Sequence, residues 1–77
     1  MIYNKNFLEN CKKLGNHIQE LREKQNISIQ EFAIKTNIST NYLQKIEQEK
    51  AYRVLIDRHL MKIVKELNVT MSELFRF

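Results

Sequence analysis

The sequence predicts an all-α fold, and three observations lead to this prediction. The 77 residues contain no proline and a single glycine, Gly15, so the usual signals that separate strands and hairpins are missing. Apolar residues recur at spacings of three and four, as they do on the buried face of a helix. The breaks between these runs are rich in Asn, Ser and Thr, which cap helices and form turns. The length fits one domain spanning residues 1–77.

The composition limits the possible classes of protein. The chain has one cysteine, Cys11, so it cannot form an internal disulfide. This cysteine and the two histidines, His17 and His59, are scattered along the sequence and do not form a cluster. We therefore expect no metal site and no cofactor. No apolar run approaches the roughly 20 residues of a membrane span, and the N-terminus lacks the features of a signal peptide, so we expect a cytoplasmic protein.

The net charge of +4 favours an anionic partner such as nucleic acid, because clustered Lys and Arg neutralise phosphates. An ordinary solvated surface explains a modest positive charge equally well. The net charge therefore supports a nucleic-acid partner only together with a sequence motif for nucleic-acid binding.

A first helix is predicted over about residues 7–25, after a short N-terminal arm at residues 1–6. Its apolar residues are spaced four and three apart and form one stripe. They are Phe7, Cys11, Leu14, Ile18 and Leu21.

Two short helices are predicted next, with a tight turn between them. Ser28 and Glu31 form a capping box, in which Ser28 accepts from the backbone N–H of Glu31 and the Glu31 side chain reaches back. Ser39 is the N-cap of the following helix. Ala33 is small, so the second helix can cross close to the first. This pattern predicts a helix-turn-helix over residues 29–48.

The second helix of this unit, residues 40–48, has one polar face opposite its apolar positions Leu43 and Ile46. Asn and Gln can pair with adenine, Lys can donate to guanine, and a Thr methyl can touch the thymine methyl. We predict that this face reads base edges in the DNA major groove; the alternative is an ordinary solvated helix face. The predicted base-reading residues are Thr40, Asn41, Gln44 and Lys45.

The C-terminal part of the chain is predicted to hold two more helices. A fourth helix is anchored at helical spacing by Ile56, Leu60, Ile63, Val64 and Leu67, and a short fifth helix follows the Thr70 cap. Leu74, Phe75 and Phe77 leave an apolar end that is predicted to be a dimer contact. The alternative is that Leu74 and Phe75 complete the core of a single chain.

Five motifs, in their order and spacing, resemble the Cro/repressor (XRE) family of helix-turn-helix DNA-binding domains. They are GNHIQELRE at 15–23, SIQEFA at 28–33, IS at 38–39, IE at 46–47 and LNVTMSELF at 67–75. The resemblance covers about residues 12–75. It implies a compact five-helix bundle of the lambda-repressor-like type that binds double-stranded DNA as a homodimer on a two-fold symmetric operator and regulates transcription.

The resemblance also implies roles for residues outside the polar face. Arg22 and Glu47 match an ion pair that orients the recognition helix; the alternative is a solvated pair worth less than about 1 kcal/mol. Lys50, Tyr52 and Arg53 match a loop that follows the DNA backbone; the alternative is a charged loop that is simply solvated. Two further phosphate contacts are predicted at the helix N-termini that begin at Ser28 and Ser39.

The sequence also departs from the family pattern. Ile29 stands where a phosphate-binding Gln is usual, and Glu49 replaces a common glycine. Tyr42 replaces a small residue, and the sequence alone assigns it no role. Ile34 occupies a usually polar position and Thr36 a usually apolar one, so an exposed Ile34 would mark a surface for a partner.

Two classes of function agree with these features. The first is a sequence-specific regulator, such as a phage repressor, a restriction-modification controller or a regulator on a mobile element. The second is an antitoxin of the same fold, which binds a toxin and its own promoter. We reject an enzyme, because the sequence has no paired carboxylates, no Cys/His dyad and no glycine-rich phosphate loop.

Overall fold

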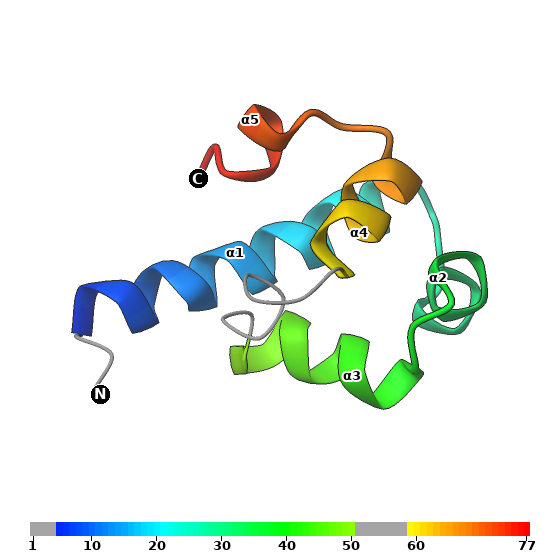
Figure 1. Ribbon diagram of the computed structural model, residues 1–77, viewed down its shortest axis with the longest axis horizontal. Helices are drawn as coiled ribbons and strands as arrows, with labels where there is room; N and C mark the ends of the chain where they lie inside the picture. The colour runs from blue at the N-terminus through cyan, green and yellow to red at the C-terminus, as the bar shows by residue number, and fades with distance from the viewer. Residues whose placement is uncertain (1–4, 51–58) are drawn as a thin grey trace.

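The computed structural model describes residues 5–50 and 59–77, except for the side chains of residues 49 and 50. The described residues form five α-helices and one π-helical turn, without a β-strand, which confirms the predicted all-α fold (Figure 1). The elements are α1 Lys5–Lys24, α2 Ile29–Thr36, α3 Thr40–Lys45, the π-helical turn η1 Ile46–Lys50, α4 His59–Leu67 and α5 Met71–Leu74.

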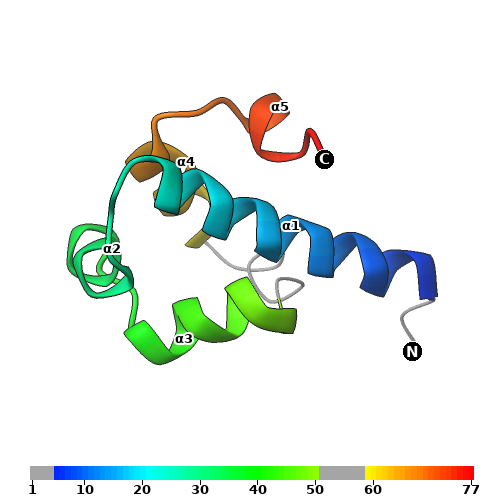
Figure 2. The same cartoon turned by 180° about the vertical axis from the view of Figure 1, so that it is seen from behind.

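The long helix α1 packs against η1 and α5, whereas α2 packs against α3 and α4. Helix α1 begins at Lys5, two residues before the predicted start, because Lys5 and Asn6 contain nothing that ends a helix. Residues 5 and 6 are therefore helical and do not belong to the predicted arm. In both views α3 and α5 lie on opposite sides of α1, and the first turns of α1 project beyond the other helices (Figures 1 and 2).

Three of the turns between helices share the same backbone conformation and hydrogen-bond pattern. Asn26, Asn37 and Asn68 adopt the left-handed conformation, with φ of 59°, 58° and 56°. In each turn the Asn N–H bonds to a carbonyl three residues back and the next N–H to one five residues back, the Schellman pattern. Each Asn is followed by an apolar residue and then by the N-cap of the next helix, in the tripeptides Asn26-Ile27-Ser28, Asn37-Ile38-Ser39 and Asn68-Val69-Thr70.

The predicted capping box at the start of α2 is only half present. Ser28 Oγ accepts from the Glu31 N–H at 3.0 Å. The Glu31 carboxylate, however, lies 3.3 Å from Lys35 Nζ, one turn further along the helix, instead of reaching back. A complete capping box starts α5, where Thr70 and Glu73 exchange bonds of 3.0 and 2.8 Å. The hydrogen bond that the Glu73 carboxylate accepts from the Thr70 backbone N–H lowers the pKa of this carboxyl.

Every α-helix and η1 contribute to one core. Its buried apolar residues are Cys11, Leu14, Ile18, Phe32, Ala33, Ile38, Leu43, Ile46, Ile63, Leu67 and Leu74. Burial raises the pKa of the Cys11 thiol. Leu60 and Val64 pack against this core as predicted for the fourth helix, whereas Ile56 lies outside the described residues.

The prediction that Leu74 contacts a second chain is wrong. Leu74 is fully buried, because α5 packs on α1 and turns this side chain into the core. The His17 ring contributes to this packing, since its Nε2 donates to the Glu73 carbonyl oxygen at 3.0 Å. Phe75 and Phe77 remain exposed.

Gly15 allows α1 to approach η1 closely. A Cβ at this position would overlap the backbone carbonyl oxygen of Ile46 in η1. A backbone atom cannot rotate out of the way as a flexible side chain can. The single glycine of the chain therefore serves helix packing and not a turn.

Replacing Gly15 by Ala is expected to destabilise the protein by up to about 2 kcal/mol, because overpacking costs about 1–3 kcal/mol and the helix propensity of Ala returns only about 1 kcal/mol. Urea unfolding measures this change. Asn16→Ala, at the exposed neighbouring position, is the control and should stay within about 0.5 kcal/mol. Equal stability of the two variants would contradict the close contact.

Candidate nucleic-acid interface

The predicted helix-turn-helix corresponds to α2, a three-residue turn at 37–39, and α3 continued by η1. The recognition helix was predicted over residues 40–48; its α-helical part ends at Lys45, and the chain continues as a π-helical turn to Lys50. The widened turn lies where Gly15 brings α1 against the backbone of Ile46.

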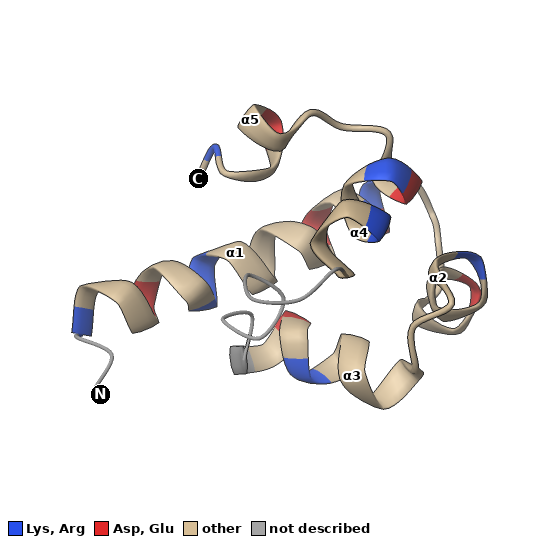
Figure 3. Ribbon diagram, viewed as in Figure 1, with Lys and Arg blue, Asp and Glu red and all other residues tan. Residues whose placement is uncertain are grey.

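The four predicted base-reading residues lie on α3, three of them opposite its buried side and Thr40 at the edge of that side. Asn41, Gln44 and Lys45 are exposed and Thr40 is half-buried. Leu43, between them, is fully buried. Lys45 is the one charged residue of α3, so the start of this helix is free of charge and its end is basic (Figure 3). The exposed side combines hydrogen-bonding amides with one cation, the groups that can read base edges.

Gln48 is a further candidate that the sequence reasoning missed. It is exposed and follows Gln44 by four residues, so it extends the same polar side into η1. The i+4 spacing was a signal that could have identified it.

Arg22 and Glu47 form a buried, two-pronged ion pair between α1 and η1. Arg22 Nε lies 2.8 Å from Glu47 Oε2, and Nη2 lies 3.0 Å from Oε1. Arg22 Nη1 also donates to the Ile27 carbonyl oxygen at 2.7 Å. The pairing with Glu47 raises the pKa of Arg22. With 8% and 4% of their surfaces exposed, the two residues do not form the solvated pair of the alternative interpretation.

The departures from the family pattern have structural explanations at two positions. The half-buried Tyr42 ring packs edge-on against His59, with ring centroids 4.8 Å apart, so it joins α3 to the start of α4. The buried Thr36 hydroxyl donates to the Phe32 carbonyl oxygen at 2.7 Å, which satisfies a polar group at an apolar position. Ile29 packs partly buried against the core.

The predicted phosphate contacts are described only in part. Ser28 and Ser39 are exposed at the starts of α2 and α3, and each side chain caps its own helix. Tyr52 and Arg53 lie outside the described residues. Lys50 ends η1, but its side chain lies outside the described part as well.

Two findings concern other kinds of site. Within the described residues, no group of three or more His, Cys, Asp or Glu side chains is placed to hold a metal ion. In the same part of the chain, no helix has both the length and the apolar character that crossing a membrane requires.

Comparison with protein families places the fold in a known group. Residues 17–77 match the family model of the Cro/C1-type HTH DNA-binding domain. The chain belongs to this family. The predicted resemblance is thereby confirmed, although the match begins at residue 17 and not near residue 12. Comparisons with curated proteins and with solved structures find no match.

As a Cro/C1-type domain, the chain is a DNA-binding regulator, and DNA is its partner. The match also divides α1. Residues 5–16 of this helix precede the matched region, whereas the recognition helix and the Arg22–Glu47 pair lie within it.

Breaking the ion pair is expected to be costly. Arg22→Met should destabilise the protein by about 3–5 kcal/mol, because it leaves the Glu47 carboxylate buried without its cation. Adding Glu47→Leu to this variant should recover part of the loss. Urea unfolding of both variants measures the effect.

Glu23→Gln is the matched control, since Glu23 is exposed and lies 4.0 Å from the same guanidinium. It should change stability by less than about 0.5 kcal/mol. A loss in Arg22→Met no larger than in this control would show that the pair does not stabilise the fold.

Proposed function

We propose that this protein is a sequence-specific transcription regulator that binds as a homodimer to a roughly two-fold symmetric operator, with residues 40–48 in the major groove. The observation that carries the proposal is the exposed polar side of α3. The buried ion pair behind it restricts the orientation of the helix. A rigidly held polar helix is suited to reading bases, because direct readout requires donors and acceptors at defined positions.

Each proposed base-reading residue has a chemical role. The carboxamides of Asn41 and Gln44 would pair with adenine N6 and N7. The Lys45 ammonium would donate to guanine O6 and N7, and the Thr40 methyl would touch a thymine methyl. Gln48 extends this side by one turn.

Phosphate contacts would set the register of the helix on the duplex. We assign them to the starts of α2 and α3, at Ser28 and Ser39, and to Lys50, Tyr52 and Arg53 beyond the recognition helix. The first two are supported by their exposed positions at helix starts. The other three rest on the sequence resemblance.

Selection of bound sequences from a random DNA library tests the proposed function. The purified protein is expected to enrich an inverted repeat whose half-sites lie about one helical turn, or a multiple of it, apart. Failure to enrich any motif would reject sequence-specific binding. Enrichment of a single unrepeated half-site would reject the homodimeric part.

Replacing Asn41 or Lys45 by Ala is expected to remove discrimination at the contacted base pair, at about 1–3 kcal/mol for each good contact. The fold should be retained, because both side chains are exposed. Titrations with selected and altered operators measure the change.

Asn16→Ala and Lys24→Ala are matched controls on α1, since both positions are exposed and neither belongs to the recognition helix. They should leave base preference unchanged. Discrimination that persists in the Asn41 and Lys45 variants would remove these residues from the readout.

The antitoxin function is a second candidate, favoured by Ile34 on α2. This large apolar side chain is 81% exposed at a position where the family pattern has a polar residue, so it offers apolar surface to another protein. A toxin gene beside the gene for this chain, and a stable complex of the two products, would distinguish an antitoxin from a simple regulator.

A further inference from the structure

An aromatic contact joins α3 to α4. The Tyr42 ring packs edge-on against the His59 ring, with the ring centroids 4.8 Å apart and the ring planes inclined by 72°. Both residues are half-buried, and α4 begins at His59, close to α3 (Figures 1 and 2). Aromatic rings prefer edge-to-face and offset arrangements over others, so this contact favours one relative placement of the two helices.

The contacts made by Gly15 and Arg22 restrain the other end of the recognition helix. Gly15 approaches the carbonyl oxygen of Ile46, and Arg22 bonds to Glu47; both contacted residues belong to η1. The four proposed base-reading residues precede η1, because they all lie on α3. The ring contact at Tyr42 therefore restrains the part of the helix that carries them more directly.

Tyr42 and Glu47 lie on opposite edges of the buried side of the recognition helix. Leu43 and Ile46 are fully buried and form the middle of that side. On a repeat of about 3.6 residues per turn, Tyr42 falls at one edge of this stripe and Glu47 at the other. A rotation of the helix about its own axis, in either sense, moves at least one of the two edges away from its partner.

We propose that Tyr42 and His59 are positioning residues for base readout. Their contact sets the rotation of α3 and thereby directs Asn41 and Lys45 toward the base edges, while a small residue at position 42 has no ring to pack against His59. The inference rests on the base-reading part of the proposed function. Because readout requires side chains held within about 0.5 Å, loss of the contact is expected to reduce specificity while the fold is retained.

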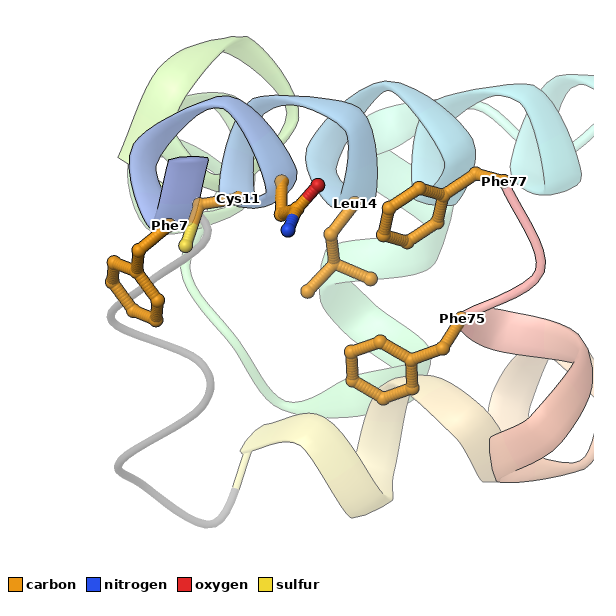
Figure 4. A pocket seen from close by; sticks show the side chains of 6 residues that line it. Phe7, Cys11, Leu14, Phe75 and Phe77 are labelled. Carbon is orange, nitrogen blue, oxygen red and sulfur yellow. The ribbon is translucent and has the colours of Figure 1, made fainter. Parts of the chain in front are cut away.

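The ring contact is separate from the candidate dimer surface. Phe75 and Phe77 lie beside Leu14 in an apolar groove between the first half of α1 and the residues after α5 (Figure 4). Neither Tyr42 nor His59 lines this groove. A change in DNA discrimination caused by substitutions at positions 42 and 59 can therefore be assigned to α3 and not to this groove.

Operator titrations with variants of Tyr42 test the positioning role. The base pairs read by Asn41 and Lys45 are first identified from the Ala variants of these two residues. Tyr42→Ala is expected to lower discrimination at these base pairs at least about 5-fold, the lower end of what one good base contact contributes. Tyr42→Phe keeps the ring and should retain discrimination within about 2-fold.

Affinity for non-specific DNA separates positioning from loss of the fold. It should change less than about 2-fold in both Tyr42 variants, because neither substitution alters a charge that could contact a phosphate. A variant that merely fails to fold loses specific and non-specific binding together. Circular dichroism should show both variants folded.

A double-mutant cycle tests whether the contact between the two rings carries the effect. His59→Ala should lower discrimination at the same base pairs as Tyr42→Ala does. The double variant should lose no more than about 2-fold beyond Tyr42→Ala alone, because the two residues act through one contact.

Val69→Ala is the matched control for a general loss of packing. Val69 is partly buried against the core in the turn between α4 and α5, outside the recognition helix. Its truncation should leave base discrimination unchanged. An equal loss of discrimination in this control would overturn the positioning role.

The remaining outcomes separate this inference from the proposed function. An enriched operator that Tyr42→Ala discriminates as well as the original chain would reject the positioning role and support the proposed function. Losses that simply add in the double variant, or a loss in Tyr42→Phe as large as in Tyr42→Ala, would also overturn the role of the ring contact. Failure to enrich any motif would reject base readout itself and the positioning role with it.

Discussion

The contact between α1 and the end of the recognition helix is the constraint on which the rest of the structure depends. Gly15 lets the α1 backbone approach the carbonyl oxygen of Ile46 closely. The Arg22 guanidinium donates two hydrogen bonds, of 2.8 and 3.0 Å, to the Glu47 carboxylate. The two contacts lie about two helical turns apart on α1, so they restrict both the distance and the rotation of the recognition helix. A buried ion pair adds little net stability relative to an apolar pair, so we propose that the main contribution of this pair is to orient the recognition helix.

The chain reverses direction without proline and without glycine in its turns. Asn tolerates the left-handed conformation better than other residues with a side chain, and it ends three helices here. The following Ile or Val anchors each turn to the core, and the next Ser or Thr starts a new helix. Turn, anchor and cap are therefore encoded within three consecutive residues.

The helix α1 lies between two parts of the molecule. The helix α3 lies on one side of it, and α5 and the C-terminal end of the chain lie on the other (Figure 2). The family match contains both of these parts but not residues 5–16 of α1.

The sequence by itself determined the features that depend on neighbouring residues. The helical class, the caps at Ser28, Ser39 and Thr70 and the two-sided character of α3 all follow from interactions within one or two turns. The predicted bond from the Glu31 side chain back to Ser28 is wrong. Lys35 lies one turn further along the helix and pairs with the Glu31 carboxylate instead.

Only the tertiary structure decided the contacts between distant segments. Arg22 and Glu47 are 25 residues apart, and their pairing was expected from the family resemblance and not from spacing. Leu74 and Phe75 are adjacent and both apolar, yet one is fully buried and the other exposed, because the seating of α5 on α1 selects which side chain faces the core. Such choices depend on the relative placement of whole helices, which no local pattern encodes.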